Sequence, residues 1–200
     1  RYNTGELMVD VNVKLDALKR KMFFQSQSYD EIVNLVHKKE EKLQSLPAIQ
    51  PVSNHDLKRM ASGYGWRIDP VYGVSKFHAG MDFTAPTGTE IYATGKGRAI
   101  KVNYSTGGYG NRIIVDHGYG YQTLYAHMSA FAIKQGEYVQ RGQVIGYVGN
   151  TGKSVGPHLH YEVHKDGEKV NPVYFYYQDL DDESFEAMIR LSENTGSSLD

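Results

Sequence analysis

The spacing of apolar residues changes near Pro47 and divides the chain into two unlike halves. Within residues 11–46, steps of four and three residues reach an apolar side chain each time except at Gln25 and Lys39. Such a heptad seam is typical of an amphipathic helix or a coiled coil. From Gly63 onward the apolar residues tend to alternate with polar ones, which indicates strands. The sequence therefore predicts a helical segment followed by a β domain.

We expect residues 1–46 to form one long helix, because this stretch has a single glycine, Gly5, and no proline. A capping box at 28–31 gives the alternative of two helices that divide around residues 24–28. The apolar seam has three readings that the sequence leaves open. It packs on its own domain or covers a groove there, it pairs with a second copy of the chain, or it contacts a different protein.

The glycine-rich second half predicts a mainly β fold, an antiparallel sheet or sandwich. Short strands are expected at 98–104, 111–116, 121–127, 143–148 and 159–164, with glycine turns between them. The expected organisation is a helical arm at 1–46, a connector at 47–62, a β domain at 63–178, and a carboxy-terminal helix and tail at 179–200.

The composition of the chain argues against several classes of function. The formal net charge of −1 gives no general attraction to nucleic acid. The chain has no cysteine, so any metal must bind nitrogen and oxygen ligands. No apolar run reaches membrane-spanning length. The sequence begins at Arg1, and we expect any membrane attachment to come from a signal or anchor upstream of it.

Two histidines in the string Gly-Pro-His-Leu-His-Tyr-Glu-Val are the strongest candidates for chemistry. Residues two apart on a strand point to one side, so His158 and His160 should face the same cleft. Neutral imidazoles bind catalytic metals and also transfer protons near neutral pH. The spacing alone does not decide which of the two binds a metal.

Three further residues complete the candidate site. His78 and Asp82 are four residues apart, and a bend at Ala79-Gly80 would let both reach one ion. His127 stands where an expected strand gives way to a loop, a common place for catalytic groups. Among the other histidines, His117 is the reserve candidate should His127 have another role.

At these residues the chain resembles the lysostaphin-type zinc endopeptidases, also called LytM-like peptidoglycan hydrolases. The resemblance runs from about Ser62 to Pro172. Its motifs are Gly-Trp-Arg-Ile-Asp-Pro at 65–70, Phe-His-Ala-Gly-Met-Asp-Phe at 77–83, Leu-Tyr-Ala-His-Met at 124–128 and Gly-Pro-His-Leu-His-Tyr-Glu at 156–162.

The resemblance implies the duplicated hybrid motif fold, with His78, Asp82 and His160 as ligands of Zn²⁺. It also implies that His127 and His158 form a catalytic pair. We add Tyr72 as a candidate hydrogen-bond donor to the oxyanion, because it precedes His78 on a loop.

The function implied is zinc-dependent hydrolysis of peptide bonds in the cross-links or stem peptides of bacterial peptidoglycan. The expected location is the bacterial cell envelope, periplasmic or otherwise extracytoplasmic. The alternative is a non-catalytic module of the same fold that binds cell wall or activates a partner hydrolase through its helical arm. Inactive relatives of that kind have lost some of the five site residues, and this chain has all of them.

Overall fold

The computed structural model describes residues 4–53, 60–68, 73–176 and 180–193 of the 200-residue chain. The chain forms two compact units, Arg1–Leu43 and Gln44–Asp200. The first unit is helical, and the second contains the strands.

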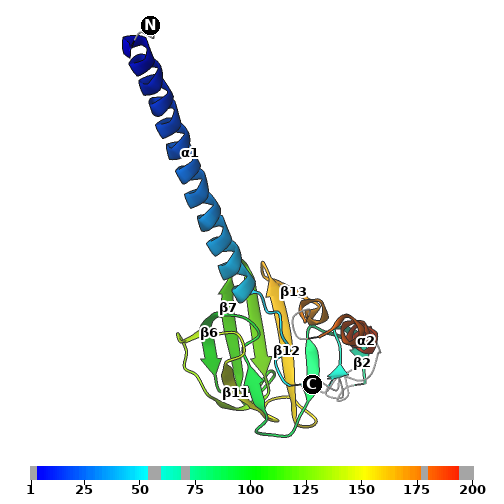
Figure 1. Cartoon of the computed structure of the whole chain (residues 1–200). Coiled ribbons are helices and arrows are strands. Elements are labelled where there is room, and N and C mark those ends of the chain that lie inside the picture. The colour runs from blue at the N-terminus through cyan, green and yellow to red at the C-terminus, as the bar shows by residue number, and fades with distance from the viewer. Residues whose placement is uncertain (1–3, 54–59, 69–72, 177–179, 194–200) are drawn as a thin grey trace. The chain divides into compact units, whose positions relative to one another are not determined.

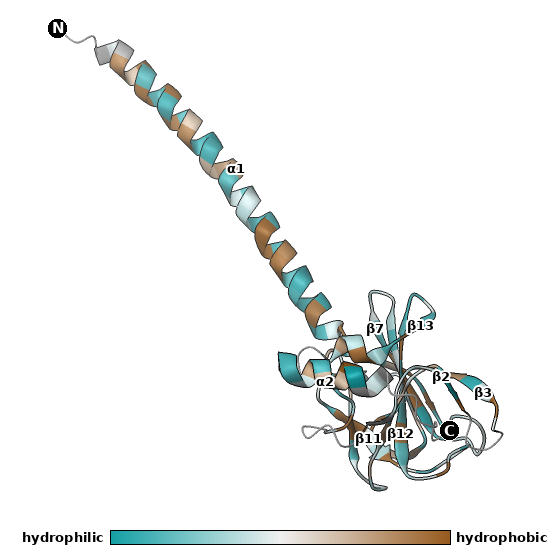
Figure 2. Ribbon diagram, turned by 90° about the vertical axis from the view of Figure 1, so that its right-hand side faces the viewer, coloured by the Kyte–Doolittle hydropathy of each residue, from teal (hydrophilic) through white to brown (hydrophobic). Residues whose placement is uncertain are grey.

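Helix α1 runs from Thr4 to Ser45 without interruption (Figure 1). The expected long helix is confirmed, and residues 24–28 continue it without a break. Apolar and polar residues alternate along the ribbon in Figure 2, and the apolar side chains of the seam are exposed, among them Leu15, Met22, Ile32 and Val36. No helix in the described part of the chain is both long enough and apolar enough to cross a membrane.

The second unit is built from antiparallel sheets, which confirms the expected fold class. The large sheet has the order β1 (Met60–Ser62), β4 (Met81–Thr84), β12 (His158–Lys165), β8 (Tyr121–Ala126), β7 (Arg112–Gly118), β6 (Gly97–Asn103) and β10 (Tyr138–Val139). Strand β13 (Glu168–Val170) pairs with β12 beside this path. A smaller sheet contains β5 (Glu90–Tyr92), β11 (Val144–Val148) and β9 (Met128–Phe131).

A separate hairpin of β2 (Gly65–Ile68) and β3 (Ser75–His78) leads into β4. A 3₁₀ turn (Pro172–Phe175) and helix α2 (Asp182–Glu193) follow the last strand. Helix α2 lies within the carboxy-terminal segment at 179–200 in which a helix was expected. The strand order places β12 near the middle of the large sheet, where neighbouring strands shield both of its edges.

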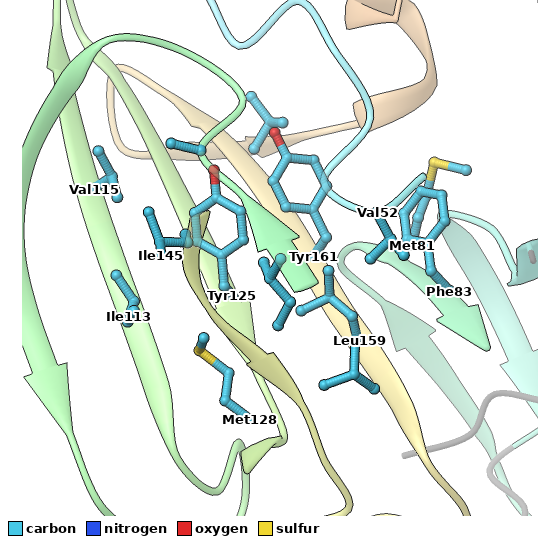
Figure 3. Packing of buried hydrophobic residues seen from close by; sticks show 14 of the residues in the cluster. Val52, Met81, Phe83, Ile113, Val115, Tyr125, Met128, Ile145, Leu159 and Tyr161 are labelled. Atoms are coloured by element: carbon cyan, nitrogen blue, oxygen red, sulfur yellow. The ribbon is translucent and has the colours of Figure 1, made fainter. Parts of the chain in front are cut away.

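The hydrophobic core lies between the two sheets (Figure 3). Leu159 and Tyr161 of β12 and Tyr125 of β8 pack in it with Ile145 of β11, and all four are fully buried. The hydroxyl group of Tyr161 donates to Thr94 Oγ1 over 2.9 Å. Because buried phenols need a hydrogen-bond partner, this contact allows a tyrosine to serve as a core residue.

The residues just after α1 also belong to the β unit. Ala48 and Val52 are fully buried, the Ala48 amide donates to the Thr94 carbonyl over 3.0 Å, and the Tyr92 amide donates to the Pro51 carbonyl over 2.8 Å. This part of the expected connector is therefore packed against the strands.

Candidate metal centre and active site

Strand register brings the candidate ligands together. In the antiparallel pairing of β12 with β4, His160 lies opposite Asp82. Opposite residues project to the same face of a sheet, so the imidazole and the carboxylate meet there. His158 lies opposite Thr84 in the same pairing, two residues along and on the same face as His160.

His78 joins this pair from the end of β3. The bend at Ala79 and Gly80 separates β3 from β4 and turns the chain back, as the sequence predicted. Gly80 lies so close to β12 that a Cβ there would collide with the Tyr161 carbonyl oxygen. Glycine is therefore needed at this position for close packing.

His78, Asp82 and His160 form a compact group of potential metal ligands. The His78 Nε2 atom lies 3.1 Å from Asp82 Oδ1 and 3.0 Å from His160 Nδ1, and the last two atoms are 3.0 Å apart. Ligands at zinc bond lengths in a tetrahedron are separated by about 3.3 Å. Three ligand atoms on one triangular face leave the fourth position of such a tetrahedron open. The donor set therefore fits a catalytic divalent metal.

The outward nitrogens of both histidines are held by other groups. His78 donates from Nδ1 to the Gly63 carbonyl over 2.7 Å, and His160 Nε2 lies 3.1 Å from Glu162 Oε1. These contacts turn His78 Nε2 and His160 Nδ1 toward Asp82, where each nitrogen can donate to the carboxylate when it is protonated or offer a lone pair to a metal when it is not. Hydrogen bonds of this kind fix the tautomer and ring orientation of metal-binding histidines.

Asp82 is fully buried, yet it is kept ionised by its neighbours. Burial by itself would raise the pKa of this carboxyl group. The charge of His78 and the hydrogen bonds from His160 and His78 outweigh burial and hold the pKa well below its usual range. The ionised carboxylate is the form that binds a metal ion.

His127 and His158 form a second pair beside the first group, with ring centroids 4.7 Å apart. His127 Nδ1 donates to the Thr151 carbonyl over 2.7 Å, and His158 Nδ1 donates to the Gly156 carbonyl over 2.8 Å. In the neutral tautomers set by these bonds, each Nε2 carries a lone pair. His158 Nε2 is buried, is 4.0 Å from Asp82 Oδ1, and has no hydrogen bond to any described residue.

His127 also has an unusual backbone conformation, with φ at 59°. A non-glycine residue in the left-handed region is uncommon and often marks a functional site. The amide groups of His127 and Met128 donate to the carbonyls of Tyr109 and Asn111 at 2.9 and 3.1 Å. These bonds hold the junction between β8 and β9 and thereby place the imidazole.

Glu162 is the most important residue near the site whose role the sequence motifs did not predict. It is fully buried on β12, and its Oε1 accepts from Tyr109 at 2.6 Å and from Lys169 at 3.1 Å in addition to its contact with His160. Burial opposes its ionisation, but hydrogen bonds from His160 and His164 lower the pKa of Glu162 strongly. The signal was present in the sequence, since Glu162 is two residues after His160 on one strand.

A second set of hydrogen bonds connects the proposed metal ligand His78 with α2. The Gly63 carbonyl that accepts from His78 also accepts from Arg67 Nε over 2.6 Å. Arg67 is buried, and its Nη2 donates to the Ser192 carbonyl over 3.1 Å. A buried guanidinium group thus connects the last helix with the backbone that orients His78.

The remaining candidates lie elsewhere. His117 is buried between the Lys96 carbonyl and Thr123 Oγ1, at 2.9 and 2.8 Å, and is not part of the group of potential ligands. His164 Nε2 is hydrogen-bonded to Glu162 Oε2 at 2.6 Å. Tyr72, the expected oxyanion donor, lies outside the described residues.

The comparisons with known proteins agree with this site. The model of peptidase family M23 matches residues 76–172. The DD-carboxypeptidase/endopeptidase Mpg of Neisseria meningitidis is 47% identical over 115 residues, which cover 58% of this chain and 26% of that protein. The peptidoglycan DD-endopeptidase ShyC of Vibrio cholerae is 42% identical over 118 residues, which cover 58% of this chain and 27% of that protein.

Among solved structures, the catalytic domain of the antimicrobial peptidase lysostaphin from Staphylococcus simulans is similar with a TM-score of 0.55 and 31% identity. The similarity covers 60% of this chain and 93% of that domain. An antiparallel β domain with a buried His-Asp-His group and a neighbouring histidine pair defines a metallopeptidase of the lysostaphin type. The chain belongs to peptidase family M23, which confirms the resemblance expected from the motifs. It spans only about a quarter of the length of Mpg and of ShyC.

Proposed function

We propose that this chain is a zinc-dependent endopeptidase that hydrolyses peptide bonds in the cross-links or stem peptides of bacterial peptidoglycan. The convergence of Asp82, His78 and His160 beside the pair of His127 and His158 carries this proposal. Relatives named as DD-endopeptidases support the substrate class. A substrate in the bacterial wall places the proposed site of action in the cell envelope, outside the cytoplasm.

His78, Asp82 and His160 would hold the zinc ion. Two neutral imidazoles and one carboxylate match the nitrogen and oxygen preference of zinc, and a cysteine-free chain offers no thiolate alternative. A zinc ion in such a site supplies Lewis acidity, which lowers the pKa of a bound water to near 7 and polarises a carbonyl group.

His127 and His158 would accept and donate protons during cleavage. Their Nδ1 atoms donate to backbone carbonyls, so each Nε2 can accept a proton from the attacking water or, once protonated, donate to the leaving amine. An imidazolium also stabilises negative charge on the carbonyl oxygen. The two residues are 4.7 Å apart at their ring centroids, close enough to act on one scissile bond.

Digestion of purified peptidoglycan sacculi tests this function. We expect soluble muropeptides whose masses identify the peptide bond that was cut, with loss of activity on chelation and recovery on addition of zinc. Asp82→Asn keeps the size of the side chain but removes its charge, so this variant should bind zinc poorly and remain inactive. Intact sacculi after incubation with the zinc-loaded protein would contradict the proposal.

The alternative is a non-catalytic module that binds wall or activates a partner hydrolase. It predicts binding to sacculi without release of fragments, and activity only when a partner enzyme is added. The same digestion, with sedimentation of the sacculi to measure bound protein, separates the two functions. Retention of all five site residues favours the enzyme.

We infer a separate role for the helical arm. Its apolar seam, which includes Leu18 and Val36, is exposed along α1, and exposed heptad seams associate with other helices. A second copy of the chain is the proposed partner, with an envelope protein as the other outcome. Sedimentation of the chain with and without residues 1–46 tests this pairing, because a monomer in both cases would exclude the homodimer.

We propose that these parts divide the chain by role. Residues 1–46 would be the arm, 47–62 the connector, 63–178 the peptidase domain, and 179–200 a carboxy-terminal helix and tail. The contacts of Ala48 and Val52 with the strands indicate that the connector should be retained with the peptidase domain in any fragment. Fragments that begin before and after residue 47 would test this division by their thermal stability.

A further inference from the structure

The hairpin of β2 and β3 carries an exposed group of aromatic side chains. It stands at the margin of the β unit (Figure 2). Trp66 of β2 pairs with Phe77 of β3, and residues that pair across two strands project to the same face. Trp66 is 67% exposed and Phe77 is 39% exposed. An exposed aromatic cluster, unlike a single exposed ring, often marks a binding surface.

Neighbouring contacts hold these rings in place. Tyr64 and Trp66 both meet Phe77 edge to face, with ring centroids 5.0 and 5.7 Å from that of Phe77. The Tyr64 hydroxyl group donates to the Lys169 carbonyl of β13 over 2.8 Å, which ties the aromatic group to the large sheet. An aromatic surface that is fixed in advance loses less entropy when a ligand binds.

This aromatic group borders the proposed active site. Phe77 directly precedes the proposed metal ligand His78, and both line a pocket of about 330 Å³ whose lining also includes His160. Adjacent Cα atoms are about 3.8 Å apart and paired Cα atoms about 5 Å apart, so the Trp66 backbone lies within about 10 Å of that of His78. The aromatic group is therefore continuous with the place where a wall peptide would be cut.

A sugar is the ligand whose chemistry fits this surface. A pyranose ring presents C–H groups on its flat faces and hydroxyl groups at its edge, so it can pack on an aromatic face while its edge remains hydrogen-bonded. Ser75 lies opposite Ile68 on the same face of the hairpin as Trp66, and it is exposed. A hydroxyl group thus adjoins the rings, and a lipid chain at this place would leave it without a partner.

The proposed substrate carries such a sugar on the peptide itself. Peptidoglycan consists of glycan chains that bear short peptides, and three peptide residues span at most about 10 Å. A wall peptide held at the metal would therefore bring its own glycan chain within reach of Trp66. No second molecule has to be captured.

We propose that Tyr64, Trp66 and Phe77 form a sugar-binding surface that packs against the glycan chain of the substrate. The enzyme would accordingly bind peptides that remain attached to sugar more tightly than the same peptides without it. This inference rests on the proposed peptidase function and adds to it a determinant of substrate choice.

Two substrates test the proposal with the zinc-loaded full chain. One is a muropeptide that retains its disaccharide, and the other is the same peptide after enzymatic removal of the sugar. Trp66→Ala should raise KM for the sugar-bearing substrate about fivefold and leave its kcat little changed, because the lost contact is made in binding and not in the chemical step. Both constants for the sugar-free peptide should stay close to those of the wild type.

Matched variants assign the effect to the aromatic surface. Trp66→Phe keeps an aromatic face and should retain most of the wild-type affinity. Tyr138→Ala is the control, since Tyr138 is 72% exposed on the edge strand β10 and is not among the described residues that line the pocket. Thermal unfolding of each variant shows whether the fold is intact, and Trp66→Ala should unfold near the wild-type temperature because this side chain is largely exposed.

The emission of Trp66 gives a second measurement that needs no catalysis and no variant. Trp66 is the single tryptophan of the chain, so its fluorescence reports on this surface alone. A tetramer of N-acetylglucosamine should change the emission in a saturable manner. A change with vesicles of phosphatidylethanolamine and phosphatidylglycerol, and none with the sugar, would overturn the proposal in favour of membrane contact.

The outcomes separate this inference from the proposed function. If Trp66→Ala changes KM equally for the two substrates, or for neither, and cleavage still depends on zinc, the sugar-binding surface is overturned and the peptidase stands. If neither substrate is cleaved by the wild type, the peptidase proposal fails and the emission of Trp66 decides. A saturable change with the sugar tetramer would then support the surface, and no change would overturn it.

Discussion

Asp82 and His160 face each other across strands β4 and β12, and their Oδ1 and Nδ1 atoms are 3.0 Å apart. They are 78 residues apart in the sequence. Antiparallel pairing of the two strands thus supplies two of the three proposed ligands, and a bend before β4 supplies the third. The metal group therefore depends directly on strand register, since a slip of one residue would turn His160 to the other face.

The histidine pair should be needed for turnover and not for metal retention. We expect His127→Ala and His158→Ala each to keep bound zinc and to lose about 10²- to 10⁴-fold in kcat, because each removes a group that transfers protons. Zinc content by elemental analysis and peptide cleavage by chromatography are measured on the same samples. Wild-type rates in His127→Ala would show that this residue has no part in the chemistry.

Glu162 should control the affinity for metal through His160. Glu162→Gln keeps the shape of the side chain but removes the charge that His160 Nε2 faces, so we expect zinc affinity to fall by about 10- to 100-fold. Competition with a chromogenic chelator measures this change. Tyr109→Phe is the matched control, since it removes one hydrogen bond to the same carboxylate and leaves the charge. Equal zinc affinity in wild type and Glu162→Gln would show that this carboxylate does not tune the site.

Close packing at Gly80 should be essential for the bend between His78 and Asp82. In Gly80→Ala the new Cβ would collide with the Tyr161 carbonyl oxygen, and we expect a loss of about 1–3 kcal/mol in the free energy of unfolding together with weaker zinc binding. Gly107→Ala is the control, because a Cβ there has no described atom within 4 Å. Urea denaturation of both variants gives the comparison. Equal stability of the two would mean that the bend accommodates a side chain.

His117 should make stability depend on pH. Burial lowers its pKa from 6.5 to about 4, although hydrogen bonding to the Lys96 carbonyl opposes the shift. The unfolded chain therefore takes up a proton at a higher pH than the folded chain does. The free energy of unfolding should fall by about 3 kcal/mol as the pH falls from about 6.5 to about 4, and then level off with respect to this group.

The measurement compares His117→Gln with wild type by urea denaturation at several pH values. The variant should lose this component of the slope, so the difference between the two proteins should itself change with pH. His37→Gln, which changes an exposed histidine on α1, should retain the wild-type slope. Parallel pH profiles for wild type and His117→Gln would refute the assignment.

Local sequence patterns were sufficient to predict several elements. The absence of proline and the heptad seam predicted α1, and alternation predicted β6, β7, β8, β11 and β12 to within about two residues of their ends. Strands such as β5 and β10 are three and two residues long, too short for a periodic signal to be distinguished. Their pairing depends on contacts far along the chain.

The candidate site shows the same limit. The i, i+2 spacing of His158 and His160 indicated a shared face, and the family resemblance implied the division of roles. Neither could indicate that the Gly63 carbonyl orients His78 or that Lys169 and Tyr109 meet at Glu162, because these contacts join distant segments. Hydrogen bonds of this kind become visible only once the register of the sheet is known.

The bond from Arg67 to Ser192 has a practical consequence for defining the smallest working fragment. A gene segment cut at residue 172, where the family match ends, would remove α2 and deprive a buried guanidinium group of this acceptor. Because Arg67 also donates to the Gly63 carbonyl, this loss would disturb the oxygen atom that orients the His78 ring. Domain limits drawn from homology alone would thus yield a protein with every catalytic side chain in place and a poorly aligned metal ligand.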